Sequence, residues 1–266
     1  MIGIFDSGFG GLSILKEIVK FLPEYSYIYL GDNARAPYGS LDEDMIYKYT
    51  VEGVDFLFKQ GADIIILACN TSSAVALRKI QQQYLPAYYP GKKVLGIIIP
   101  TVEEVVNQTT AVIGVLGTEA TIYSKSFQKE IAKINPDIKV FGQACPLFVG
   151  AIEIGNYLNK EFESVIKNYL TDLLDKSADI KSIILGCTHY ALIEEQIKKF
   201  LPPQIEVISQ GNLIAMKLED YLKRHGEVRP EKGAKRIFFT TGQAAEINDL
   251  ACHFYGGSIK FNKLSF

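Results

Sequence analysis

The sequence predicts an α/β protein built on mainly parallel β-sheets. Short runs of apolar, β-branched and aromatic residues recur along the chain. Most of them are continuous, with no alternation of polar residues, which is typical of strands buried on both faces. Segments with the helical spacing of apolar residues lie between these runs, and strands that alternate with helices indicate βαβ units. We therefore expect open parallel sheets covered by helices.

The strands are predicted from the apolar runs, and the clearest helices from apolar residues that repeat every three or four positions. In chain order the predicted strands are IGIF at 2–5, YSYIYL at 25–30, DIIILA at 63–68, KVLGIII at 93–99, AVIGVLG at 111–117, IKVF at 138–141, SIILG at 182–186, IEVIS at 205–209 and RIFFTT at 236–241. The two clearest helical segments are 11–22 and 161–175. Each of these helices has one apolar face that can cover a sheet.

Two segments far apart in the sequence resemble each other, and this favours two α/β units of similar design. DIIILACNTSSAVAL at 63–77 and KSIILGCTHYALI at 181–193 both consist of an apolar strand, a small residue, a cysteine with a threonine nearby, and a helix. The two cysteines are 187 − 69 = 118 positions apart, about one domain length. Chance similarity between two strand–helix turns is the alternative, and the shared Cys and Thr count against it.

Composition and charge exclude several classes of protein. The chain has 266 residues, of which 48% are hydrophobic and 22% charged, as in an ordinary globular protein. The net charge of −2 gives no indication of nucleic acid or an anionic membrane as a partner. The apolar runs are too short to span a membrane, and MIGIFDSG lacks the features of a signal peptide, so a cytoplasmic location is expected. The four cysteines form no C-x-x-C pair, so no metal site is expected.

Polar residues gather where the predicted strands end, and in open α/β sheets ligands bind beyond the carboxyl ends of the strands. DSGFGG follows the first strand, but it completes neither the P-loop nor the G-x-G-x-x-G pattern. Asp6 at this strand end would disfavour phosphate and suit an ammonium group, or it would simply cap the turn that follows. Both interpretations of Asp6 remain open at this stage.

Cys69 and Cys187 each stand at the end of a predicted strand, directly before a helix. The helix N-terminus is expected to lower the pKa of each thiol and make thiolate accessible at neutral pH. No G-x-S-x-G elbow is present, and a Cys–His hydrolase would not need a second reactive cysteine. Two thiols that face one cleft instead suit removal of a proton from one face of a substrate and donation to the other.

Five motifs together carry a resemblance to a known family. IGIFDSGFGGLSIL, GDNARAPYG, ACNTSSA, GVLGTEATIYS and LGCTHY resemble, in this order, the signatures of the glutamate racemases of the aspartate/glutamate racemase superfamily. The likeness runs from Gly3 to about Ile193, with a weaker tail at FFTTG, residues 238–242.

The resemblance implies two α/β domains related by pseudo-twofold symmetry, with the active site in the cleft between them. The first domain would comprise 1–96 and 209–266, and the second 97–208. It also implies conversion of L-glutamate to D-glutamate for peptidoglycan synthesis, without a cofactor or metal, in a protein that is commonly a homodimer.

The resemblance further implies the site residues. Cys69 and Cys187 would be the two acid/base residues, with Asp6 assisting Cys69, and His189 and Glu153 assisting Cys187. The implied substrate-binding residues are Asp6, Ser7, Tyr38, Gly39, Asn70, Thr71, Thr118, Thr188 and His189.

Several positions depart from the family pattern, and two functional alternatives remain. The departures are Thr101, Gly150, Ala151, Ala191 and Ser209, which are expected to border the cleft and to bear on substrate preference and domain motion. One alternative is racemisation of aspartate or another acidic amino acid. The other is a non-catalytic sensor of an acidic amino acid, which would need neither thiol. Arg35 is expected to hold its own loop through Asp32, with a contact to a substrate carboxylate as the competing role.

Overall fold

The computed structural model describes residues 1–108 and 112–265, and it shows two open parallel sheets. The six-stranded sheet has the order β10-β9-β2-β1-β3-β4. Its strands are β1 (Ile2–Asp6), β2 (Tyr27–Gly31), β3 (Ile64–Leu67), β4 (Lys93–Gly96), β9 (Arg236–Thr240) and β10 (Phe261–Lys263). The four-stranded sheet has the order β6-β5-β7-β8. Its strands are β5 (Val112–Gly117), β6 (Val140–Ala144), β7 (Ile180–Gly186) and β8 (Glu206–Ile208).

All strand pairs within the two sheets are parallel, and the predicted fold class is therefore confirmed. The order β2-β1-β3-β4 in one sheet matches β6-β5-β7-β8 in the other, so the first four strands of each sheet follow the same path. Cys69 follows β3 and Cys187 follows β7, which occupy equivalent places in the two orders. The repeated sequence pattern thus corresponds to a repeated topology.

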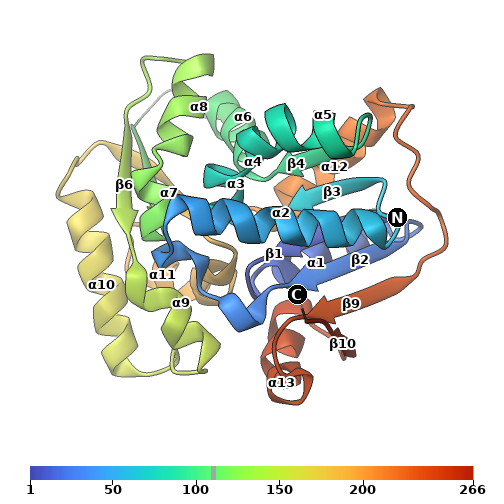
Figure 1. The fold of residues 1–266 in the computed structure, drawn as a ribbon. Coiled ribbons are helices and arrows are strands. Elements are labelled where there is room, and N and C mark those ends of the chain that lie inside the picture. Colours follow the sequence, from blue (N-terminus) through green and yellow to red (C-terminus); the bar gives the residue numbers. More distant parts are fainter. Residues whose placement is uncertain (109–111, 266) are drawn as a thin grey trace.

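Helices connect the strands and cover the sheets (Figure 1). The helices before β5 are α1 (Gly11–Phe21), α2 (Glu43–Lys59), α3 (Asn70–Val75), α4 (Leu77–Lys79), α5 (Leu85–Tyr88) and α6 (Ile98–Gln108). Those after it are α7 (Glu119–Tyr123), α8 (Ser126–Ile134), α9 (Pro146–Glu153), α10 (Lys160–Leu174), α11 (Glu194–Lys199), α12 (Gly211–Arg224) and α13 (Ala244–Tyr255). Short 3₁₀ segments η1 (Asn33–Arg35), η2 (Tyr38–Ser40) and η4 (Thr188–Ile193), and a π-helical segment η3 (Ile80–Tyr84), complete the connections.

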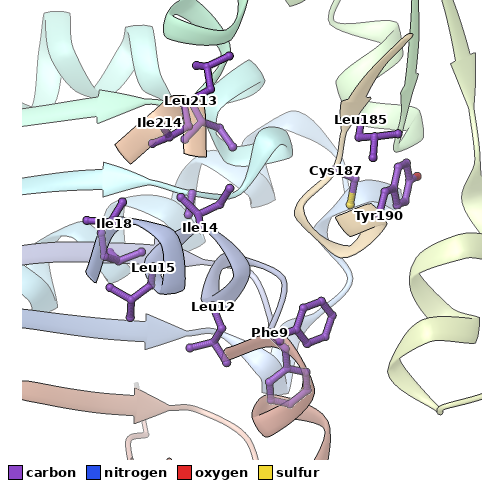
Figure 2. Packing of buried hydrophobic residues seen from close by; sticks show 14 of the residues in the cluster. Phe9, Leu12, Ile14, Leu15, Ile18, Leu185, Cys187, Tyr190, Leu213 and Ile214 are labelled. Carbon is purple, nitrogen blue, oxygen red and sulfur yellow. The ribbon is translucent and has the colours of Figure 1, made fainter. Parts of the chain in front are cut away.

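Alternate residues of β1 point to opposite faces of the six-stranded sheet, and each face has its own helices. Ile2 and Ile4 belong to the core cluster that contains the apolar face of α1. Phe5 belongs to a second cluster, which contains the inner face of α2. Figure 2 shows α1 side chains, including Ile14 and Ile18, near Leu213 and Ile214 of α12. Burial on both faces explains why these strands read as continuous apolar runs.

Helix α6 packs with the four-stranded sheet. Val102 and Val105 of α6 join a third cluster with Val115 of β5 and Ile184 of β7. Helix α12, in contrast, packs against α1 of the other sheet. The chain passes between the sheets where α6 and α12 begin; the proposed domain boundaries near 96 and 208 stay predictions.

Most predicted strand limits differ from the observed ones by one to three residues, and one strand was not predicted. The strand predicted over 93–99 ends at Gly96, and Ile98 already begins α6. The three isoleucines at 97–99 continue the apolar run, but Pro100 fits the first turn of a helix, where no backbone donor is lost. The predicted strand over 111–117 is observed from Val112, and Ala111 lies outside the described residues. Strand β10 was not predicted, because FNK is short and largely polar.

In the two described stretches of the chain, we find no helix with the length and apolar character that crossing a membrane requires.

Candidate active site

The ends of β1, β3, β5 and β7 meet around one small cavity between the sheets. β1 and β3 are neighbours in one sheet, and β5 and β7 are neighbours in the other. In each pair the chain leaves the two strands in opposite directions, and open α/β sheets usually bind ligands at such a point. The cavity has a volume of about 20 Å³. Its lining residues are Ser7, Pro37, Tyr38, Gly39, Cys69, Asn70, Thr71, Thr118, Val149, Cys187, Thr188 and His189. The two predicted cysteines therefore face the same space from different sheets.

The other two predicted site residues, Asp6 and Glu153, lie directly behind this lining. Thr188 Oγ1 donates to Asp6 Oδ2 over 3.3 Å, and Glu153 Oε1 lies 3.0 Å from His189 Nε2. Two lining residues were not predicted, Pro37 and Val149. Pro37 falls inside the GDNARAPYG motif and Val149 stands next to Gly150, but an apolar side chain carries no chemical signal that marks it as part of a site.

Cys69 caps the N-terminus of α3 and is almost completely buried. Its sulfur lies 3.4 Å from Ser7 Oγ and accepts a long hydrogen bond of 3.5 Å from the backbone N–H of Ser72. Burial raises the pKa of the Cys69 thiol, the negative charge of Asp6 raises it further, and the bonds from Ser7 and Ser72 offset only part of this. The expectation that the helix N-terminus lowers the pKa is therefore wrong for Cys69, because desolvation of the thiolate outweighs the helix donors.

Asp6 is fully buried, and it connects the first sheet to the loop that follows Cys187. Its Oδ1 accepts a 2.8 Å bond from the backbone N–H of Gly8, so Asp6 does organise the turn after β1. Its Oδ2 accepts the bond from Thr188 described above. Burial raises the pKa of Asp6, and the nearby His189 partly offsets this shift. Asp6 influences Cys69 through charge.

Cys187 lies beside a histidine that is held by a carboxylate. His189 Nδ1 is 3.8 Å from the Cys187 sulfur, while its Nε2 faces Glu153. His189 is buried, with its ring edge-on to Phe254 of α13 at 5.4 Å between centroids. Burial alone would lower the pKa of His189, but the hydrogen bonds with Cys187 and Glu153 and the negative charges of these two groups together outweigh burial and raise the pKa well above 6.5. The imidazole is thus suited to carry a positive charge next to the Cys187 sulfur.

Short polar side chains occupy the cavity wall between the two cysteines. Thr71 Oγ1 of the first sheet lies 2.9 Å from Thr118 Oγ1 of the second, and Thr118 caps α7. A Cβ at Gly39 would come within 2.6 Å of Thr118 Cβ, so only glycine allows this loop to approach so closely. Asn70 makes two hydrogen bonds with Gln210, which was not predicted as a site residue. These hydroxyl and amide groups can donate to a carboxylate.

The loop between β2 and α2 is held by Asp32, and Arg35 belongs to this loop structure. Arg35 Nε donates to Asp32 Oδ2 over 2.7 Å, and the Tyr38 hydroxyl also donates to Asp32. The Arg35 guanidinium stacks on Tyr49 at 3.9 Å from the ring centroid. The predicted loop role of Arg35 is therefore confirmed. Tyr38 lines the cavity while its hydroxyl is directed to Asp32.

Metal-ligating side chains do not cluster in the part of the chain that the structure describes: no group of three or more His, Cys, Asp or Glu residues there could hold an ion. What the cavity assembles is a pair of thiols with different neighbours and a wall of hydrogen-bond donors. Such a set can exchange protons with a small anionic molecule held between the sulfurs.

Comparison with known proteins agrees with this chemistry. The family model described as Asp/Glu/Hydantoin racemase matches residues 2–218. A curated glutamate racemase of Paracoccus denitrificans is 38% identical over 271 residues, covering 98% of both chains. A crystal structure of a glutamate racemase isoform from Bacillus anthracis has a TM-score of 0.90 at 32% identity, covering 100% of this chain and 97% of that one.

A second similar structure contains a ligand. The glutamate racemase of Francisella tularensis in complex with D-glutamate has a TM-score of 0.89 at 34% identity, covering 99% of this chain and 97% of that one. The match of sequence and structure over nearly the whole length, together with the two cysteines in one cavity, shows that this chain belongs to the Asp/Glu/hydantoin racemase family.

Proposed function

We propose that this protein racemises glutamate, with Cys69 and Cys187 as the two acid/base groups on opposite faces of the Cα atom. The observation that carries the proposal is the meeting of these two thiols, from equivalent strand ends of different sheets, in one cavity. One cysteine takes the Cα proton as thiolate, and the other supplies a proton to the opposite face as thiol. The Cα–H bond breaks on one face and a new Cα–H bond forms on the other, so the configuration at Cα is inverted while the bonds from Cα to carbon and nitrogen stay intact.

The two thiols are suited to start in different protonation states. The raised pKa of Cys69 favours its thiol form. The charged form of His189, which Glu153 supports, would stabilise negative charge on the Cys187 sulfur. This arrangement gives one base and one acid before substrate binds, which a two-base reaction needs. After one turnover the cysteine that was a thiolate is a thiol, and the other is a thiolate. The two original protonation states must be restored before a second turnover in the same direction.

The polar wall of the cavity would bind the carboxylates and support the carbanion. Asn70, Thr71, Thr118 and Thr188 present amide and hydroxyl donors within the lining. Donors placed in advance at a buried site stabilise developing negative charge without reorganisation of water. No cofactor takes part in the proposed reaction.

The cavity has room for about one water molecule, so the sheets or their loops must separate before an amino acid enters. Closure around the substrate would then remove water from between the sulfurs. Because both sheets supply lining residues, closure also completes the catalytic pair.

The proposal extends to the biological setting. D-glutamate made here would serve peptidoglycan synthesis in the cytoplasm, and the protein would act as a homodimer. The support is the similarity to glutamate racemases over 98% of the chain.

The test is the effect of serine at each cysteine. Cys69→Ser and Cys187→Ser should each lower kcat by about 10²–10⁴-fold, since each removes one positioned proton-transfer group. The measurement is circular dichroism of each glutamate enantiomer, with incorporation of solvent deuterium at Cα followed by mass spectrometry. Cys252→Ser, a substitution of the half-buried cysteine on α13, is the matched control and should keep the wild-type rate.

Near wild-type turnover in either active-site variant would end the two-base proposal. A faster rate with aspartate than with glutamate would reassign the substrate. Binding of glutamate with no deuterium exchange in the wild-type protein would favour a sensor.

A further inference from the structure

Gln210 connects the two places where the chain passes between the sheets. The first crossing follows β4, and Thr101 lies in the α6 helix that begins there; the second follows β8, and Gln210 stands directly before α12. Gln210 Nε2 donates to Thr101 Oγ1 over 3.0 Å. Both side chains are buried, at 4% and 0% exposure, so water does not compete for this bond.

The same carboxamide pairs with Asn70 beside the catalytic cysteine. Asn70 Nδ2 donates to Gln210 Oε1 over 2.7 Å, and Gln210 Nε2 donates to Asn70 Oδ1 over 3.2 Å. Asn70 follows Cys69 in the chain and lines the cavity. The side-chain amide of Asn70 is therefore held by a residue that belongs to the second crossing.

A chain of hydrogen bonds sets the orientation of both amides. The carbonyl of Ile97 can only accept, and Thr101 Oγ1 donates its one hydrogen to it over 2.6 Å. The Thr101 oxygen must therefore accept from Gln210, which turns the Gln210 nitrogen toward Thr101. The Gln210 oxygen is then left to accept from Asn70, so the polarity of Asn70 is determined by a backbone carbonyl at the first crossing.

We propose that Gln210 is a positioning residue for substrate binding, an inference that rests on the proposed function. A primary amide has two N–H groups, and Gln210 accepts one from Asn70. The other N–H of Asn70 serves a carboxylate oxygen of the amino acid. Because Gln210 also forms a hydrogen bond with Thr101, the orientation of the Asn70 amide toward the substrate depends on the relative positions of the two crossings. Substrate recognition is thereby linked to the arrangement of the two sheets.

The first test separates polarity from shape. Gln210→Glu keeps the shape but replaces the donor nitrogen with an acceptor, and Thr101→Val keeps the shape but removes the hydroxyl. Each should raise the KM for both glutamate enantiomers by about five- to tenfold, as expected for one lost hydrogen bond, with kcat changed by less than about twofold. Thr101→Ser should restore the wild-type KM. Ser26→Ala, which removes another buried hydroxyl far along the chain, should leave KM unchanged.

The second test asks whether Gln210 acts through Asn70. Gln210→Ala should raise KM in the wild-type background and have no further effect in an Asn70→Ala background. Independent, additive effects of the two substitutions on KM would overturn the inference.

A third measurement needs no activity. The side-chain amide signals of Asn70, identified by their loss in Asn70→Ala, should shift or broaden in ¹H–¹⁵N spectra of ligand-free Gln210→Ala and Thr101→Val, and stay in place in Thr101→Ser and Ser26→Ala. Unchanged Asn70 signals in Gln210→Ala would refute the positioning role even if the wild-type protein did not racemise glutamate. A wild-type protein that exchanges no Cα deuterium, with the Asn70 signals shifted as expected, would refute only the proposed function.

Discussion

The two cysteines of the cavity have the same structural origin but different electrostatic surroundings. Cys69 has hydroxyl neighbours and a buried carboxylate, Asp6, that disfavours the thiolate. Cys187 has an imidazole that is itself held by a carboxylate. The two sides of the cavity therefore differ chemically, although both thiols stand at equivalent strand ends. The difference arises from the residues beside each cysteine: Ser7 and Asp6 at one, His189 at the other.

The raised pKa of His189 predicts that its ring is still protonated at pH 7 in the ligand-free protein. Two-dimensional NMR can follow the protonation of the His189 ring, because a chain with 3 histidines gives few imidazole signals to separate. Glu153→Gln removes one of the groups that raise the pKa, so the His189 titration should move to lower pH. A His189 titration near 6.5 in both proteins would contradict the assigned environment.

The same shift predicts a stability change with pH. A histidine whose pKa is raised in the folded state binds more protons folded than unfolded, so its contribution to stability is complete below pH 6.5 and is lost as the pH rises through the folded pKa. His189→Asn should therefore flatten the loss of unfolding free energy that urea denaturation measures as the pH rises above about 6.5. An equally steep decline in both proteins would show that other groups cause it.

At the scale of elements, the approach of helices to the sheets depends on glycine at particular positions. Gly53 of α2 lies against the ring of Phe5 in β1, and a Cβ there would overlap the ring. Gly150 of α9 is exposed, and a Cβ there would meet nothing within 4 Å. The two positions are both helical and differ in packing.

Alanine at these two glycines should have opposite effects on stability. Gly53→Ala should destabilise the protein by about 1–2 kcal/mol, because overpacking costs more than the gain in helix propensity. Gly150→Ala should stabilise it by about 0.5–1 kcal/mol, because only the propensity gain applies. Chemical denaturation of both variants measures the difference. Equal effects would mean that α2 can move away from the sheet at little cost.

At the scale of the molecule, the site depends on direct contact between the loop after β1 and the loop after β7. A Cβ at Gly10 would overlap Thr188 and come within 2.7 Å of His189 Nδ1. The two loops belong to different sheets, and each sheet carries one of the two thiols, so a change in the separation of the loops would shift the thiols relative to each other. Glycine at position 10 is required by this close approach.

Gly10→Ala should lower kcat/KM by about 10²-fold, since a displacement of about 1 Å at a catalytic group has this effect. Far-ultraviolet circular dichroism should show an intact fold. Gly226→Ala, at an exposed glycine with no atom within 4 Å of the added Cβ, is the control and should leave kcat/KM unchanged. Wild-type kcat/KM in Gly10→Ala would mean that the loops tolerate separation.

Local patterns in the sequence were sufficient to predict the α/β class, most strands, and the placement of Cys69 and Cys187 at strand ends. Burial on both faces of a parallel sheet leaves continuous apolar runs, and a ligand site beyond strand ends leaves polar residues after them. The end of β4 at Gly96 and the short strand β10 could not be read in this way. The apolar run at 93–99 hides the start of α6, and three residues, two of them polar, are too few to mark β10 as a strand.

The tertiary structure alone decided how the site residues act on one another. The pKa of Cys69 is raised because burial and the charge of Asp6 outweigh the helix donors, and burial is a property of the folded chain. Gln210 is part of the site because it forms hydrogen bonds with Thr101 and Asn70, which precede it in the sequence by 109 and 140 positions. A sequence determines which chemical groups are present and their local geometry, whereas dielectric surroundings and long-range hydrogen bonds exist only once distant segments have packed together.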